Sequence, residues 1–170
     1  DAPAVRLTTN PDGTAVTASY STDGQQFATV GRPAPLSAFG SNLRIGPAAL
    51  SDLAPSVPVA SFDWIRFDPD GSGGGGTTVT DDFDGTMLGA PWAVTRQEQG
   101  TLVVNGGTLQ IAAAPGDVYQ TRNDAKNLAL RPAPTGPWTA TTKLNFEGTA
   151  QYHQAGIMVL EADVEAGTPL

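Results

Sequence analysis

Two separate segments of the chain combine aromatic rings with planar polar side chains. A sugar-binding surface needs this mixture, because an aromatic face packs against the C–H face of a sugar while amide and guanidinium groups bond its hydroxyls. The candidate ligand-binding residues are Tyr119, Gln120, Arg122, Tyr152, His153 and Gln154. The pattern predicts a carbohydrate-binding surface if the fold brings the two segments together. For His153, a structural or surface hydrogen bond is the competing interpretation.

The acidic residues are weaker candidates for chemistry. Glycoside hydrolysis needs two carboxylates about 5–9 Å apart across a cleft. The chain has four glutamates, which are Glu98, Glu147, Glu161 and Glu165. Nothing in the sequence pairs any two of them, and the aspartates at 81, 82 and 84 stand where a strand is expected to begin, which favours turn capping. We therefore predict no catalytic residue and no enzymatic activity of the chain itself.

Metal and cofactor chemistry has little support in the sequence. The chain has no cysteine, and His153 is the only histidine, which excludes sulfur-based zinc sites and multi-histidine centres. We predict no metal ligand and no cofactor. A structural calcium ion near the aspartate cluster stays open as an alternative, because calcium accepts several oxygen ligands.

The overall charge excludes two classes of partner. The chain has 170 residues and a net charge of −8, and only nine of its residues are Lys or Arg. So few cations cannot form the basic surface that nucleic acid requires, and an acidic protein is repelled by an anionic membrane surface. We predict neither a nucleic-acid nor a membrane partner.

The elements that must position the candidate residues are β-strands. The chain contains 20 Gly and 14 Pro, no segment has the pattern of an amphipathic helix, and strand-like runs alternate with turn residues. Hairpins are expected around the turns at 10–13 and 105–107, and further strands at 116–121, 127–131, 138–147 and 154–160. In the strand at 59–67, Phe62 and Trp64 are expected to face the core. The spacing is typical of an all-β sandwich.

The sequence after a glycine-rich run resembles a known family. The runs DDFDGTMLGAPWAVTRQ, VVNGGTLQI, GDVYQTRNDAKNLALRPAPTGPWTATTKLNFEG and YHQAGIMV resemble the first half of a concanavalin A-like jelly-roll domain. They are similar to the β-xylosidase C-terminal-like domain of secreted, multidomain actinobacterial proteins. The runs VRLTTNPDGTAVTASYSTDGQQFATVGRPA, SNLRIGPAAL and ASFDWIRF resemble the second half of the same family. The resemblance implies a jelly-roll antiparallel β-sandwich.

The order of the two halves is reversed relative to that family. We expect the second half at 1–68, a Gly-rich linker at 69–80, the first half at 81–160 and a frayed tail at 161–170. Either the chain is a slice through a tandem array of repeats, or it is a circularly permuted single domain. A half-sandwich would expose an apolar face and open strand edges. We therefore expect the two halves to pack as one domain.

The resemblance implies a function as well as a fold. We expect a non-catalytic accessory module that binds a polysaccharide or oligosaccharide, in an extracellular, secreted protein. Its partners would be carbohydrate and the neighbouring domains of a multidomain protein. The alternatives are a structural spacer or interaction module without a ligand, and a fragment of a glycoside hydrolase.

Overall fold

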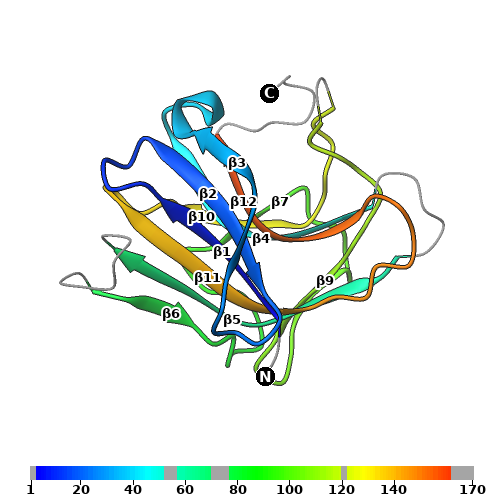
Figure 1. Cartoon of the computed structure of the whole chain (residues 1–170). Helices are drawn as coiled ribbons and strands as arrows, with labels where there is room; N and C mark the ends of the chain where they lie inside the picture. The colour runs from blue at the N-terminus through cyan, green and yellow to red at the C-terminus, as the bar shows by residue number, and fades with distance from the viewer. Residues whose placement is uncertain (1–2, 52–56, 70–76, 120–121, 162–170) are drawn as a thin grey trace.

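The computed structural model describes residues 3–51, 57–69, 77–119 and 122–161. They form two antiparallel β-sheets and one short 3-10 helix, η1 (Leu36–Phe39) (Figure 1). The large sheet consists of β3 (Ala28–Pro35), β2 (Ala15–Ser21), β1 (Ala4–Thr9), β11 (Trp138–Asn145), β5 (Val59–Pro69), β9 (Leu109–Ala112) and β8 (Leu102–Val104), with β6 (Val79–Asp81) paired to β5. The small sheet consists of β12 (His153–Glu161), β4 (Leu43–Ser51), β10 (Leu128–Pro132) and β7 (Ala93–Thr95). Within the described residues, no helix is long and apolar enough to span a membrane.

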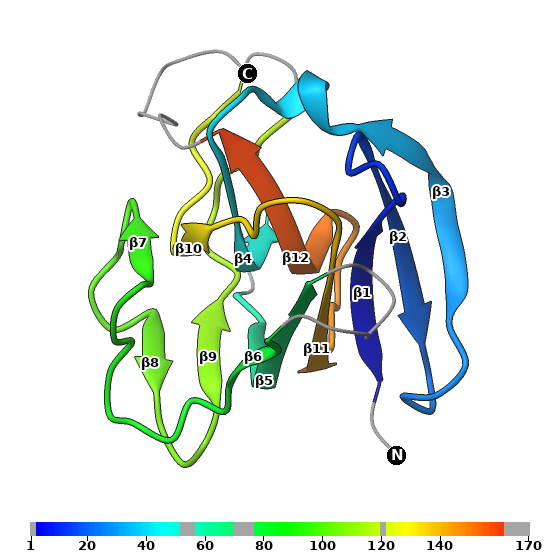
Figure 2. The same ribbon diagram turned by 90° about the vertical axis from the view of Figure 1, so that its left-hand side faces the viewer.

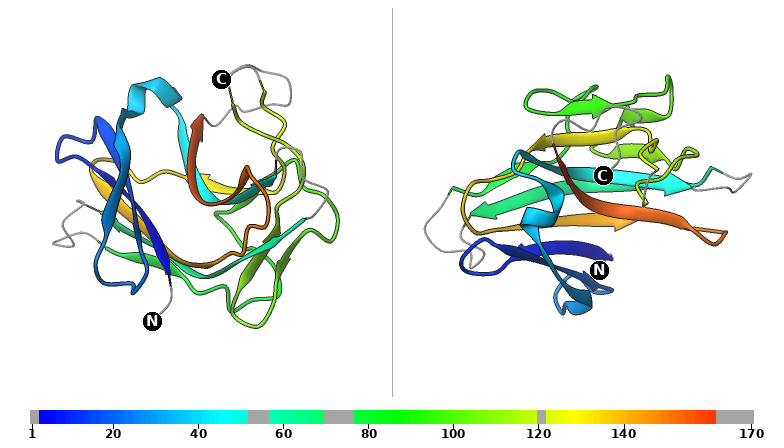
Figure 3. Two further views of the ribbon diagram at one scale, coloured as in Figure 1. Left: turned by 45° about the vertical axis from the view of Figure 1, so that its right-hand side comes forward. Right: turned by 90° about the horizontal axis from the view of Figure 1, so that it is seen from above.

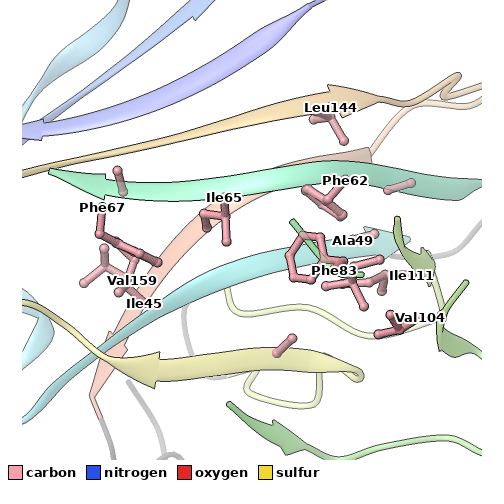
Figure 4. Close-up of a cluster of buried hydrophobic side chains, with 14 of the residues drawn as sticks. Ile45, Ala49, Phe62, Ile65, Phe67, Phe83, Val104, Ile111, Leu144 and Val159 are labelled. Atoms are coloured by element: carbon pink, nitrogen blue, oxygen red, sulfur yellow. The ribbon is translucent and has the colours of Figure 1, made fainter. Parts of the chain in front are cut away.

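The two sheets lie face to face. Figure 2 shows the strands of the large sheet side by side from β8 to β3, and Figure 3 shows the small sheet as a second layer over it. Side chains from both sheets fill the space between them, with β5 supplying Phe62, Ile65 and Phe67 and the small sheet supplying Ile45 and Val159 (Figure 4). This arrangement is the predicted all-β sandwich.

The first hairpin forms as its turn residues predict. The side-chain oxygen of Asn10 accepts hydrogen bonds from the backbone N–H groups of Thr14 and Ala15, at 2.9 and 2.8 Å. Gly13 adopts a φ of 70°, which a glycine reaches without steric cost. The second predicted hairpin is β8 and β9, joined by Gly106 and Gly107, both at positive φ.

A bulge in β5 explains why the prediction for Trp64 is wrong. On β11, Lys143 pairs with Trp64 but the next residue, Leu144, pairs with Phe62, so β5 carries one extra residue. The extra residue reverses the alternation, because side chains in a regular strand point to opposite faces in turn. Phe62 and Ile65 therefore both face the core, while Trp64 lies half-buried on the outer face of the sheet.

Other strand boundaries also differ from expectation. β3 continues through Pro33 and Pro35, which is tolerated because β3 is the edge strand and needs no ladder hydrogen bonds on its open side. The expected strand at 116–121 is absent from the described residues 116–119, where Asp117 instead makes hydrogen bonds within a loop. β4, for which no strand is given above, extends from Leu43 to Ser51.

Strands from the two sides of residues 70–76 pair with one another in both sheets. In the large sheet, β5 pairs with β11 from Ser61 to Pro69, and β1 pairs with the other edge of β11. In the small sheet, β4 lies between β12 and β10. The apolar core thus contains side chains from both segments of the chain.

Gly46 of β4 is required by close packing inside the small sheet. A Cβ atom at this position would lie 1.8 Å from the carbonyl oxygen of Ala129 and 3.0 Å from the ring of Trp92. Neither the backbone of β10 nor the Trp92 ring can retreat without moving its own strand or loop.

We predict that Gly46→Ala lowers the free energy of unfolding by at least about 1–3 kcal/mol, the usual cost of overpacking. Gly156→Ala is the matched control, because a Cβ there meets no atom within 4 Å and β12 is paired with β4. Urea unfolding of the two variants measures the difference. Equal stability of the two variants would contradict this prediction, because it would show that the sheet shifts to accommodate a Cβ atom at position 46 without loss of stability.

Candidate functional site

The end of β4 brings the two predicted segments to the same place. Ser51, the last residue of β4, pairs with His153 at the start of β12 and forms an isolated bridge with Pro115. The backbone N–H of Gly116 donates to the Ser51 carbonyl at 3.1 Å. The segment that contains Tyr119 and the segment that contains Tyr152 therefore lie on opposite sides of one strand end.

The loop after Pro115 is closed by its own hydrogen bonds. The carboxylate of Asp124 accepts from the backbone N–H of Asp117 at 2.8 Å, and the Asp117 carbonyl accepts from the N–H groups of Asp124 and Ala125. Gly116 has a φ of 150°, and a Cβ there would lie 2.5 Å from the Asp124 carbonyl oxygen. The loop geometry thus depends on Gly116 and on the ionised carboxylate of Asp124.

Tyr119 belongs to this loop and has 65% of its surface exposed. Arg122 follows it and forms an ion pair with Asp124, with Nη2 and Oδ2 3.2 Å apart. Because Asp124 also holds the Asp117 amide, the Arg122 side chain is oriented by the same group that closes the loop. Gln120, the third predicted residue of this segment, lies outside the described residues.

His153 has a structural role in its own loop. Its Nδ1 atom accepts hydrogen bonds from the backbone N–H groups of Thr149 and Ala150, at 3.1 and 3.2 Å. Nε2 therefore carries the proton of the neutral ring, since Nδ1 acts as an acceptor. Nε2 is buried and has no hydrogen-bond partner among the described residues, and the same holds for the hydroxyl of the neighbouring Ser51. Two unpaired polar atoms on paired residues mark a place where a small polar molecule could bind.

Tyr152 and Gln154 flank His153 but have different surroundings. Tyr152 is 57% exposed and adopts a φ of 68°, so its backbone turns sharply just before β12 begins. Gln154 is exposed and points to the face opposite that of His153, because neighbouring residues of a strand alternate. On that outer face, Met158 of β12 packs in the same apolar cluster as Val118 of the loop.

The structure therefore brings part of the predicted set together. Tyr119, Arg122, Tyr152 and Gln154 all lie on exposed or half-exposed surface, and Val118 and Met158 from their two segments each pack against one buried cluster that includes Leu50 of β4. His153 is adjacent but is held by backbone contacts. No hydrogen bond or ring contact among the described residues joins Tyr119 directly to Tyr152.

A shallow pocket near this surface was not predicted from the sequence. Its volume is about 570 Å³, and it is lined by Val57, Pro58, Val59, Asn145, Glu147 and Thr149. Thr149 also donates its backbone N–H to His153, so the pocket adjoins the His153 loop. The lining residues come from segments about 90 positions apart in sequence, and only the pairing of β5 with β11 brings them together. Of the residues that line this pocket, only Glu147 is a candidate in the sequence, as one of its four glutamates.

The acidic residues elsewhere have structural partners. Asp81 accepts from the Trp92 indole N–H at 2.6 Å and from the Phe83 backbone N–H at 2.9 Å, which is the turn capping expected of the aspartate cluster. Glu98 forms an ion pair with Lys126, and Glu161 accepts from the backbone N–H of Asn42 at 3.1 Å. In the part of the chain that the structure describes, no three His, Asp or Glu side chains gather as a metal site would require.

The fold places the protein in the class of concanavalin A-like jelly-roll sandwiches, with two antiparallel sheets around one core. Comparison with protein families identifies the family within this class. The model of the β-xylosidase C-terminal concanavalin A-like domain matches residues 80–165, about half of the chain, and the chain belongs to this family. A search of curated proteins finds no match. The family description points to an accessory domain of glycoside hydrolases.

The loop that carries Tyr119 should loosen in acid. The pKa of Asp124 is lowered, chiefly because the Asp117 backbone N–H bonds its carboxylate and secondarily through Arg122. A group whose pKa is lowered by folding stabilises the folded loop above the ordinary Asp pKa of about 3.9 and loses this effect as the pH falls through the lowered value.

We predict that hydrogen-exchange protection of the Asp117 amide decreases as the pH falls below about 4. Asp124→Asn should lack this pH dependence. The Asn105 amide serves as an internal control, because it donates at 2.9 Å to the Thr108 carbonyl and not to a carboxylate. Protection of Asp117 that stays constant across the acid range would contradict the role of Asp124.

Proposed function

We propose that the protein is a non-catalytic accessory module that binds carbohydrate through the surface around the end of β4. The observation that carries the proposal is the exposure of two tyrosine rings, Tyr119 and Tyr152, on the two segments that flank Ser51. A single exposed ring is ordinary on a protein surface, but exposed apolar groups that gather on one face mark interaction sites. Sugars present an apolar face that such rings accommodate.

The polar groups around the rings support the same ligand class. Arg122 is oriented by Asp124, and Gln154 projects from β12 on the side of the loop. A guanidinium and an amide offer several donors and one acceptor in fixed planes, which suits the hydroxyls of a sugar. Both tyrosine rings are exposed, which suits a polysaccharide or oligosaccharide chain better than an enclosed small molecule.

The proposal includes an extracellular location and a multidomain parent protein. An accessory domain acts by holding a partner domain near its ligand, and polymeric glycans are extracellular materials. Neighbouring domains are thus proposed as the second class of partner. The family description, which names a C-terminal domain of β-xylosidases, supports this arrangement.

We further propose that residues 1–68 and 81–160 form one jelly roll in reversed order, tethered at 69–80. The pairing of β5 with β11 and of β4 with β12 supports this proposal, because each sheet would lose an internal strand pair if the segments separated. The binding surface would then also depend on both segments, since Ser51 and Tyr119 come from different ones.

A matched set of tyrosine variants tests carbohydrate binding. Tyr119→Ala removes one ring, and Tyr152→Asn removes the other with a residue that tolerates the positive φ at this position. We expect each to lower the affinity for a bound glycan about fivefold or more, the effect of losing about 1 kcal/mol of aromatic contact. Tyr20→Ala is the control, because Tyr20 is 49% exposed but lies on β2 of the other sheet.

The first measurement is a glycan array with xylans, arabinans and their oligosaccharides, followed by titration calorimetry on whatever binds. Absence of binding to every glycan would favour the spacer without a ligand. Release of reducing sugar would instead favour a hydrolase fragment. Equal loss of affinity in Tyr20→Ala would show that the surface around β4 is not the site.

Cleavage between the two segments tests the single-domain proposal. A protease site inserted at residues 70–76 should be cut without separating the fragments, because the strand pairs between them remain. We expect the cut protein to elute as one species in size-exclusion chromatography under native conditions and to separate in urea. Separation of the fragments without denaturant would indicate two independent partial repeats.

A further inference from the structure

The outer face of the large sheet presents a row of polar side chains across several strands. The strand register places Arg6 of β1 opposite Thr141 of β11, and Thr141 opposite Arg66 of β5. Directly opposed residues of antiparallel strands point to the same face. The core-facing residues of β5 define the other face, so Arg6, Thr141 and Arg66 all point outward.

Each arginine of this row is held in place by contacts on the sheet. The Arg6 guanidinium lies 3.5 Å above the Phe27 ring, and its Nε donates to the Thr141 hydroxyl at 3.1 Å. The Arg66 guanidinium lies 5.9 Å from the Trp64 ring. Thr141 beneath them is only 2% exposed. The side chains are therefore spread over the sheet surface, where stacking on aromatic rings limits their motion.

The charges on this face differ from those of the whole chain. The chain carries a net charge of −8, yet the face gathers Arg6, Arg66 and Lys143. Arg66 is paired with Asp68 at 2.9 Å, and Lys143 is paired with Asp63. Arg6 has no carboxylate partner among the described residues. Partial burial, and secondarily the neighbouring charge of Arg66, lower the pKa of Arg6, while the Asp68 carboxylate opposes this shift.

A bound anion would reduce the electrostatic repulsion between the Arg6 and Arg66 guanidinium groups. Two guanidinium groups on strands separated by only one other strand repel each other, and each strand step is about 4.8 Å. A carboxylate bound by Arg6 would accept two parallel N–H bonds, the geometry in which guanidinium binds carboxylate most strongly. The half-exposed Trp64 ring lies on the same outer face, on the strand that carries Arg66. It offers an apolar surface beside the bound carboxylate.

We propose that the outer face of the large sheet is a second ligand-binding surface, specific for a carboxylated polysaccharide, that is, one containing uronic acid residues. Arg6 binds the carboxylate, with Arg66 adding positive charge, and Trp64 contacts the sugar ring. In the adjoining row of the register, Thr8 lies opposite Thr139, whose buried hydroxyl donates to that of Thr8 at 3.3 Å, and Thr139 lies opposite Asp68, the partner of Arg66. This surface is on the opposite layer from the end of β4, so it does not depend on the carbohydrate site proposed above.

The experiment compares two forms of one polymer. Polygalacturonate should bind to the whole protein, and the binding should weaken as the salt concentration rises. The fully methyl-esterified polymer keeps the same backbone but has no charge, and it should bind at least about tenfold more weakly, the effect of losing a charge-assisted hydrogen-bonded pair. Poly-glutamate provides carboxylates without sugar rings, and it should bind as weakly as the ester.

Variants assign the binding to this face. Arg6→Gln should lower the affinity for polygalacturonate at least about tenfold, and Arg6→Lys should restore only part of it because an ammonium cannot form the two-pronged contact. Arg32→Gln removes the same charge from an exposed position of β3 and should have little effect. Urea unfolding of each variant confirms that the fold is retained.

Several outcomes would overturn the proposal. They are the absence of polygalacturonate binding, equal binding of the ester or of poly-glutamate, and equal effects of Arg6→Gln and Arg32→Gln. Loss of polygalacturonate binding in the Tyr119 and Tyr152 variants, with Arg6→Gln unaffected, would assign the acidic polymer to the β4 site instead. Failure of the carbohydrate site proposed above would leave these results unchanged.

Discussion

The bulge in β5 is the constraint on which both faces of the large sheet depend. One extra residue opposite Lys143 lets Phe62, Ile65 and Phe67 all enter the core, although regular alternation would send one of them outward. The same residue turns Trp64 to the outer surface. Without the bulge, either the core would lose a large aromatic side chain or the outer face would lose the ring that lies beside Arg66. A local irregularity of the backbone thus determines packing on one side and surface chemistry on the other.

The small sheet depends in turn on a second close contact. Gly46 lets β4 approach the backbone of β10 and the ring of Trp92, and Trp92 is held by its bond to Asp81 and by Arg131 stacked over it. With β4 fixed, its last residue, Ser51, becomes the point where the Tyr119 loop and the start of β12 meet. The position of the proposed carbohydrate site is therefore a consequence of how tightly β4 packs within its sheet.

The two proposed surfaces divide the ligand chemistry between the two layers of the sandwich. Around β4 the exposed groups are tyrosine rings with Arg122 already paired to Asp124, a combination suited to neutral hydroxyls. On the outer face of the large sheet, Arg6 lacks a carboxylate partner among the described residues, which suits an anionic sugar.

The sequence by itself determined the all-β class, the family resemblance, both hairpins and the six candidate residues, because turn residues and strand alternation are local signals. It could not show that Trp64 turns outward, since a bulge is defined only by the partner strand. It also could not show that His153 is held by backbone groups, that Glu147 lines a pocket, or that Arg6 and Arg66 share a face. The His153 contacts are made within one loop, whose conformation the residue types alone do not specify. The pocket at Glu147 and the shared face of Arg6 and Arg66 arise from strand register between segments more than 50 residues apart, which only the tertiary structure decides.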